Sequence, residues 1–348
     1  MTQSPGSGSR TLRTTAGAVA RVLILGLAVH LLLPQIATLE QSARILRSLA
    51  WYAVAAAVFS QMLSYAGSGY EVQQILASYG QQVRLRRCLA MVMGSFSLSL
   101  VGGGQLTTSG SMYRWLRASG ATADSALVAG VLPALINLAT IGAVSVAGVL
   151  YLLAVHRLPS GIAVALALAL SLLFSATLFL WVGLHYRAWF AAFVDDLGRR
   201  WARFRHRPYS SDALTGSVER LFRGADVIVS GGWRRPVAGD VVNVGFDFLT
   251  LYLLFLAAHY VPNPAMVVAG YGLPMLAAKV TPIHGGLGVV EGGMVGLFLG
   301  LGAPNGIAVI VTLSYRLVSF WIPALIGFGA ALTLSRAGSA DGEATVQS

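Results

Sequence analysis

Residues 279–291 read KVTPIHGGLGVVE and divide an apolar stretch that runs from Pro264 to Gly302. Proline removes a backbone donor and clashes with the preceding helical turn, and glycine loses more entropy than other residues on entering a helix. This cluster therefore ends a helix in the middle of the stretch. Broken backbone at membrane depth is tolerated only where protein or a water-filled cavity surrounds it. We predict a re-entrant hairpin of two half-helices that reaches a polar cavity.

A second apolar stretch, Cys88–Tyr113, has a similar interruption. Its break falls at three consecutive glycines, and the polar Gln105 follows directly. We predict a second re-entrant hairpin with this break at its tip. Two ordinary helical hairpins, whose glycines allow close packing, remain the alternative for both stretches. The residues predicted to break the two hairpins are Gly102, Gly103, Gly104, Pro282, Gly285, Gly286 and Gly288.

The composition indicates a membrane protein. Apolar residues make up 56% of the 348 residues and charged residues only 11%, whereas soluble domains carry about 25% charged residues. We therefore predict an all-α, polytopic membrane helix bundle. Beside the two hairpins, six stretches have the length of about 20 residues that a full span requires. They are Ala18–Leu39, Leu49–Ala66, Ser125–Val155, Gly161–His185, Val237–Tyr260 and Gly306–Ser335.

The order of these elements predicts an inverted repeat. The halves 18–155 and 161–335 each read span, span, hairpin, span, and the second half begins on the opposite side of the membrane. Inverted repeats of this kind occur in many transporters, with the substrate site near the membrane midplane. We predict one membrane domain over 18–335, with disordered tails at 1–17 and 336–348.

Arginine residues predict the orientation. The chain has 24 Lys and Arg against 13 Asp and Glu, a net charge of +11. Ten arginines fall between Tyr186 and Pro236, and Arg10, Arg13 and Arg21 lie near the N-terminus. Cytoplasmic loops are enriched in such residues, so we predict a protein of the inner (cytoplasmic) membrane with both termini in the cytoplasm. The first hairpin then enters from the cytoplasm and the second from outside.

The cytoplasmic segment 186–236 has its own pattern. Aromatic and aliphatic residues recur at three- and four-residue spacing between the arginines, which predicts an amphipathic helix on the inner leaflet or a lid packed on the bundle. The positive charge favours anionic phospholipids as partners. Since no basic soluble domain is visible, we expect no nucleic-acid partner. The apolar positions are Phe190, Phe193, Val194, Leu197, Trp201 and Phe204.

Charged residues inside predicted helices are the candidate functional groups, because each costs about 2.5–3.5 kcal/mol to insert at membrane depth. Lys279 or Arg316 would face a lipid phosphate, and Glu291 would orient the cation. Buried structural ion pairs are the alternative. Together with polar residues at the two breaks, the predicted substrate-binding residues are Lys279, Glu291, Arg316, Asp247, His284 and Gln105.

Motifs of enzymes are absent from the sequence. It contains no His-Glu-x-x-His, no Gly-x-Ser-x-Gly and no Walker loop, which are the patterns of zinc hydrolases, serine hydrolases and nucleotide hydrolases. The single cysteine, Cys88, cannot form an intrachain disulfide. We therefore expect neither enzymatic activity nor a cofactor or metal site.

The sequence PIHGGLGVVE at 282–291, followed by Tyr315, Arg316 and Pro323, resembles the membrane region of bacterial lysylphosphatidylglycerol synthases in its free-standing version. The resemblance implies a flippase-type domain that moves a phospholipid between leaflets. It also implies that the hairpin residues Pro282 and Glu291, with Arg316, belong to the family's motifs. Where the family pattern suggests an acidic residue in the first hairpin, this chain has Gln105. The synthase domain is not present, so we expect no aminoacylation of lipid.

Three functions remain open at this point. The first is a lipid flippase or scramblase. The second is an accessory protein that binds a polyprenyl phosphate or glycolipid for a separate envelope glycosyltransferase, and the third is a proton- or sodium-coupled exporter of a small solute. A homo-oligomer is compatible with each of them.

Overall fold

The structure is a computed structural model, which describes residues 49–102, 104–155, 171, 185–205, 216, 218–220, 222–223, 226, 232–281 and 284–346. Within these ranges it is helical and contains no strand, which confirms the prediction of an all-α bundle. The predicted span Ala18–Leu39 lies outside the described residues, as does Gly161–His185 apart from two positions. The predicted N-terminal tail 1–17 also lies outside them.

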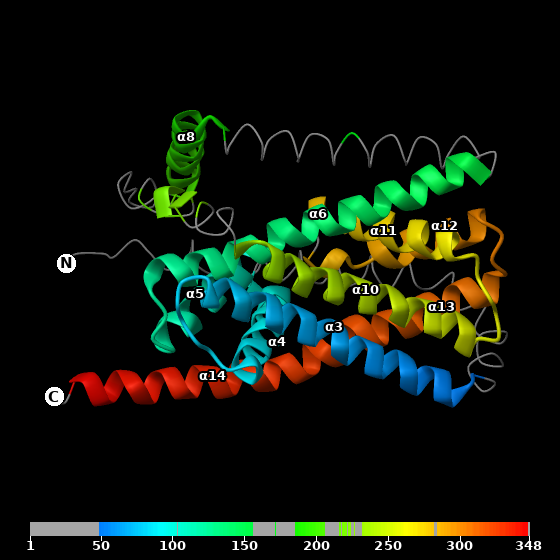
Figure 1. Cartoon of the computed structure of the whole chain (residues 1–348), viewed down its shortest axis with the longest axis horizontal. Coiled ribbons are helices and arrows are strands. Elements are labelled where there is room, and N and C mark those ends of the chain that lie inside the picture. Colours follow the sequence, from blue (N-terminus) through cyan, green and yellow to red (C-terminus); the bar gives the residue numbers. More distant parts are fainter. Residues whose placement is uncertain are drawn as a thin grey trace, which may run out of the picture.

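Figure 1 shows an elongated bundle whose long helices run roughly along one axis. The described helices are α3 (Trp51–Ala77), α4 (Leu85–Gly102), α5 (Gln105–Ala118), α6 (Ala123–Val155), α8 (Arg187–Arg205), α10 (Arg234–Ala257), α11 (Pro264–Val280), α12 (Val289–Gly300), α13 (Asn305–Arg316) and α14 (Ile322–Val346). A short 3₁₀ turn, His284–Gly286, lies between α11 and α12, and a π-helical segment, Leu317–Trp321, joins α13 to α14.

Three described helical stretches are long and apolar enough to cross a membrane: Ala123–Leu150, Arg234–Ala257 and Asn305–Arg336. They coincide with the predicted third, fifth and sixth spans. The predicted second span, Leu49–Ala66, lies within α3, which continues to Ala77 and is more polar than these three. Four of its polar side chains, Ser60, Gln61, Ser64 and Glu71, are buried inside the bundle, so the apolar run in the sequence ends before the helix does.

The last helix also extends beyond its predicted end. α14 continues to Val346, into the segment 336–348 that the sequence predicts to be disordered. Extending an existing helix adds one backbone hydrogen bond per residue without the cost of nucleation, which is a reason for the difference.

The two halves pack as an inverted repeat. The order long helix, hairpin, long helix occurs first as α3, α4–α5, α6 and again as α10, α11–α12, α13–α14. Several contacts within and between the halves have equivalents. The packing of α4 on α14 corresponds to that of α11 on α6. Likewise, α3 packs on α4 as α10 packs on α11, and α5 packs on α6 as α12 packs on α13. In Figure 1, α4 and α5 lie toward one end of the bundle, and α11 and α12 toward the other.

Helices α3 and α10 form the central pair of the bundle. They approach closely at two glycines, since a Cβ atom on Gly67 would lie 2.7 Å from the backbone oxygen of Gly239. Ser60 Oγ donates to the backbone oxygen of Phe246 at 2.8 Å, and Asn243 Nδ2 donates to Ser64 Oγ at 2.9 Å. Glycine faces and side-chain hydrogen bonds are the usual means of joining helices in lipid.

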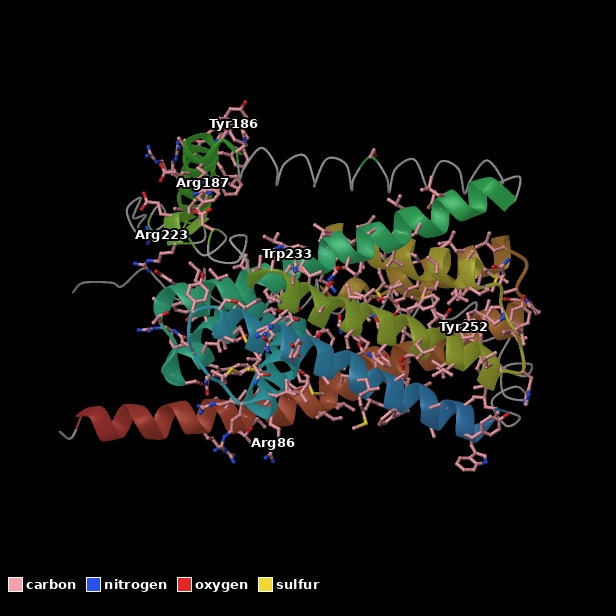
Figure 2. All side chains as sticks on the ribbon, in the orientation of Figure 1. Arg86, Tyr186, Arg187, Arg223, Trp233 and Tyr252 are labelled. Carbon is pink, nitrogen blue, oxygen red and sulfur yellow. The ribbon has the colours of Figure 1, made fainter. Side chains whose placement is uncertain are left out.

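Helix α8 lies at one end of the bundle, as Figure 2 shows by the labelled Tyr186 and Arg187. Arg187 forms a double hydrogen bond with Asp226, at 2.6 and 2.8 Å, and this hydrogen bonding lowers the pKa of that carboxyl. Trp189 and Leu197 are exposed.

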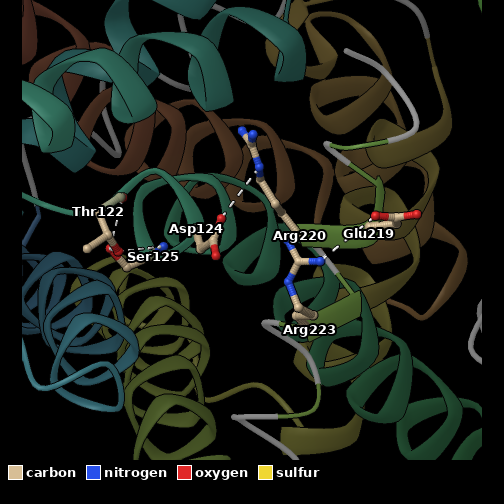
Figure 3. Close-up of polar contacts among 6 residues, drawn as sticks. All are labelled: Thr122, Asp124, Ser125, Glu219, Arg220 and Arg223. Atoms are coloured by element: carbon tan, nitrogen blue, oxygen red, sulfur yellow. Dashed lines mark hydrogen bonds and ion pairs between the residues drawn. The ribbon is translucent and has the colours of Figure 1, made fainter. Parts of the chain in front are cut away.

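The segment after α8 contacts the start of α6. Figure 3 shows Arg220, whose Nε lies 3.6 Å from Oδ1 of Asp124 in the first turn of α6, and Arg223, which lies beside Glu219. All four side chains are exposed. Because exposed ion pairs contribute little to stability, we regard these contacts as positioning the segment weakly.

Candidate functional site in the bundle interior

The second hairpin break lies beside the end of α4, next to the first break. In the second break Gly285, Gly286 and Gly288 have φ values of 70°, 61° and 82°, which glycine adopts without the steric cost paid by other residues. A Cβ atom on Gly285 would lie 3.4 Å from the side chain of Leu100, near the end of α4. In the first break Gly104 has φ 75°. The second break thus approaches the end of α4, while Val101 and Leu106, which flank the first break, are 69% and 85% exposed.

A buried ion pair closes the second break. Glu291, in the first turn of α12, accepts from the backbone N–H of Gly288 at 2.7 Å and from Nε of Arg316 at 2.6 Å. Arg316 also donates to the carbonyl of Gly285 at 3.0 Å, and its guanidinium lies 4.0 Å from the ring centre of Phe320. In this conformation Glu291 and Arg316 form the buried structural ion pair that the sequence left as the alternative. The Arg316 guanidinium is already bonded and is not available to a phosphate.

Asp247 lies at the junction of three helices. Its Oδ2 accepts from the hydroxyl of Tyr271 on α11 at 2.8 Å and from that of Tyr315 on α13 at 2.9 Å. Both tyrosines are fully buried. These two donors hold the carboxyl in the interior, close enough to Arg316 to interact electrostatically with it.

Lys279 differs from the other three charged residues. Its side chain is exposed, and among the described residues it makes no hydrogen bond or ion pair. Tyr271, Met275 and Lys279 fall at four-residue steps, which places them on one face of α11, and Tyr271 shows that this face turns toward α10. The ammonium interacts electrostatically with Asp240, Asp247 and Glu71. Lys279 is therefore an exposed cation on the face of α11 that turns toward α10.

Two buried acidic residues are not among those predicted from the sequence. Asp240 on α10 is 1% exposed and Glu71 on α3 is 2% exposed. Asp240 Oδ1 accepts from Nδ2 of Asn137 on α6 at 2.8 Å. Asp240 lies seven residues before Asp247, which is two helical turns on the same face. This spacing is the feature of the sequence that could have identified Asp240. Glu71 lay beyond the predicted end of its span at Ala66.

The structure thus brings together Lys279, Glu291, Arg316 and Asp247 at or near the second break. Gln105 is exposed at the start of α5 and takes part in none of the contacts that join these four. The side chain of His284 lies outside the described part, as do Pro282 and Gly103. Among the residues that the structure describes, no group of three or more His, Cys, Asp or Glu could hold a metal ion.

These features define a polytopic, all-α membrane protein built as an inverted repeat around a charged interior. The chain belongs to the family described as the lysylphosphatidylglycerol synthase TM region, whose model matches residues 19–327. This confirms the resemblance seen in the sequence.

Similar curated proteins are archaeal, whereas the resemblance pointed to bacteria. The chain is 30% identical over 131 residues to a UPF0104 membrane protein of Methanocaldococcus jannaschii, which is 37% of this chain and 39% of that protein. It is 36% identical over 83 residues to one of Pyrococcus horikoshii, which is 24% of this chain and 25% of that protein. The matches thus span about two-fifths or less of these relatives.

Proposed function

We propose that this protein moves an anionic phospholipid or related lipid between the leaflets, along a polar path past the two hairpin breaks. The observation that carries the proposal is Lys279, an accessible cation beside the second break that makes no ion pair in the described part of the chain. A lipid phosphate would bind this ammonium while the acyl tails stay in the bilayer. Such binding offsets the cost of bringing a charged headgroup to membrane depth.

Lys279 fits this role better than Arg316. An ammonium on a flexible four-carbon stem can follow a moving headgroup. The Arg316 guanidinium already donates to Glu291 and to the carbonyl of Gly285, so it would reach a ligand only after that pair opens. We assign the Glu291–Arg316 pair the role of holding the second break in shape.

Two further lines support a lipid-transport role. The family takes its description from the membrane region of a lipid synthase, and inverted repeats with broken helices are typical of transporters. We propose that the protein lies in the inner membrane with both hairpins re-entrant and both termini cytoplasmic. Figure 2 supports one orientation, because the labelled Arg86, Arg187 and Arg223 lie toward the same end of the bundle. We propose no covalent step and no cofactor.

Lipid movement in proteoliposomes tests the proposal. The full chain is reconstituted with fluorescent phosphatidylglycerol, and the inward or outward transfer is read by quenching the label from one side. Lys279→Met should slow transfer about tenfold or more, because a hydrogen bond to a charged group contributes about 1.5–3 kcal/mol. Lys279→Arg should keep most of the rate, and the exposed Arg86→Met should keep all of it.

Two results would contradict the proposal: transfer by Lys279→Met at the unmodified rate, or no transfer by the unmodified protein. Tight retention of a polyprenyl phosphate without transfer would support the accessory role instead.

A further inference from the structure

Two buried carboxyl groups on neighbouring helices lie close together in the bundle. Glu71 is near the end of α3, and Asp240 follows Gly239 in α10. The helices touch here, since a Cβ atom on Gly239 would lie 2.8 Å from the backbone nitrogen of Glu71. The two carboxyls interact electrostatically. Oε1 of Glu71 and Oδ2 of Asp240 are buried and have no hydrogen-bond partner in the described part of the chain.

The packing register places Lys279 beside this pair. α10 and α11 are joined by the short loop 258–263 and run in opposite directions. From the Asp247–Tyr271 contact, Asp240 lies seven residues toward the start of α10, and Lys279 lies eight residues toward the end of α11. At about 1.5 Å per residue the offsets are about 10.5 Å and about 12 Å, so Lys279 and Asp240 are nearly level. The electrostatic interaction of Lys279 with both Asp240 and Glu71 agrees with this.

The groups that face this pair supply little positive charge. α11 contributes Lys279, α10 contributes a further acid, Asp247, and α6 contributes only the neutral Asn137 and Thr140. α4 carries the buried thiol of Cys88 in an adjacent apolar cluster, while its arginines are exposed. The guanidinium of Arg316 on α13 is paired with the carboxylate of Glu291 on α12. No charged residue occurs in the π segment 317–321.

A proton bound to Glu71 or Asp240 reduces the negative charge of the pair and supplies a hydrogen-bond donor. Two adjacent buried carboxylates repel each other, and an unpaired buried charge costs several kcal/mol. A protonated carboxyl is neutral and has one O–H donor, so a proton on either carboxyl removes the repulsion between the two charges. With that proton, one negative charge remains on the pair and balances Lys279.

We propose that Glu71 and Asp240 form a proton-binding site with Lys279 as its counter-charge, and that this site couples lipid movement to proton movement. The coupling, though not the proton site itself, rests on the proposed function. When a lipid phosphate binds Lys279, the ammonium no longer balances the remaining carboxylate. That carboxylate then takes up a second proton from water, and it returns the proton when the phosphate leaves. One proton thus accompanies each negative headgroup.

Infrared difference spectra of the full chain in lipid nanodiscs test the proton site. Near neutral pH, the unmodified protein should show the C=O stretch of a protonated carboxyl, shifted in D₂O. Glu71→Gln and Asp240→Asn should each remove it or reduce it by the area of one carboxyl. Asp124→Asn, which changes an exposed carboxyl on α6, should leave it unchanged. The proton site is wrong if the band is absent, or if it survives in both site variants.

A further variant and a sodium titration complete the test. If both site variants fail to fold, Lys279→Met still leaves the two carboxyls in place. Loss of the counter-charge disfavours the carboxylate form, so the band should persist to higher pH, and an unmoved band would overturn the proposal. Removal of the band by sodium at constant pH would show a sodium site and would equally overturn it.

Flux measurements then separate the proton site from the proposed function. In proteoliposomes with a pH gradient, lipid transfer by the unmodified protein should follow the gradient, and transfer by Asp240→Asn should not. Transfer that ignores the gradient in the unmodified protein would refute the coupling but leave the lipid function standing. The expected infrared band in a protein that moves no lipid would refute the lipid function but leave the proton site standing.

Discussion

The two hairpins have equivalent positions in the repeat but different chemistry. α4 packs on α14 through Gly327, where a Cβ atom would overlap the backbone oxygen of Met93, and through a 2.7 Å hydrogen bond from Ser97 to the Ala324 carbonyl. α11 packs on α6 in the corresponding way, and a Cβ atom on Gly272 would lie 2.6 Å from Ser145 Oγ.

Charge distinguishes the two breaks. The first, at 102–104, is followed by an uncharged and exposed Gln105. The second lies between Lys279 and Glu291, and Arg316 closes it. Small residues thus maintain the same frame in both halves, while the charged residues beside the breaks, Lys279, Glu291 and Arg316, belong to the second half. Symmetry of packing does not require symmetry of function.

The largest effect should come from breaking the buried pair of the second hairpin. Glu291→Ala leaves Arg316 buried without its carboxylate, and removing one partner of a buried pair costs about 3–5 kcal/mol. We expect a large fall in thermal stability in detergent, measured by the loss of monomeric protein after heating. This result would favour the buried structural ion pair that the sequence left as the alternative.

The double variant Glu291→Gln with Arg316→Met is the control for that prediction. Since neither charge is then left unpaired, it should recover a large part of the lost stability. Equal stability of Glu291→Ala and the unmodified protein would contradict the buried-pair assignment.

The next effect tests whether both hairpins depend on close packing. Gly327→Ala and Gly272→Ala each place a methyl group against a neighbouring helix, and overpacking costs about 1–3 kcal/mol. Gly329→Ala, on the same helix as Gly327 but with open space around its Cβ, should be neutral or slightly stabilising. Denaturant titration in detergent would measure all three, and similar losses in both hairpins would support the symmetric frame.

Losses of similar size should follow removal of the donors to Asp247. Tyr271→Phe and Tyr315→Phe each delete one hydroxyl, and a hydrogen bond to a charged group contributes about 1.5–3 kcal/mol. Lipid transfer should fall less than in Lys279→Met, because the phosphate-binding ammonium remains. Should either variant abolish transfer while remaining folded, Asp247 would have a direct part in substrate binding.

The smallest effect should come from adding charge to the first hairpin. Gln105→Glu supplies the acidic residue that the family resemblance leads one to expect. Because Gln105 is exposed, stability should change by no more than about 0.5 kcal/mol, and lipid transfer should stay at the unmodified rate. A clear gain or loss of transfer would show that the first break also contacts the substrate.

The sequence predicted the frame better than the site. Glycine runs located both hairpins because their backbone effect is local, and apolar length located three spans that the structure describes. The pairing of Glu291 with Arg316 needed the fold, since 25 residues separate them. Glu71 was missed because α3 continues past Ala66, and its polar face becomes apparent only when packed on α10.

Chemical access to Lys279 tests the central claim most directly. Lys279→Cys is treated in liposomes with a charged, water-soluble methanethiosulfonate, and the unmodified protein, whose single cysteine Cys88 is buried, gives the background. We predict that the new thiol reacts, that phosphatidylglycerol slows the reaction more than phosphatidylcholine does, and that Leu325→Cys on the apolar exterior does not react. A thiol at position 279 that is unreactive, or equally reactive in both lipids, would contradict a water-filled, anion-binding interior.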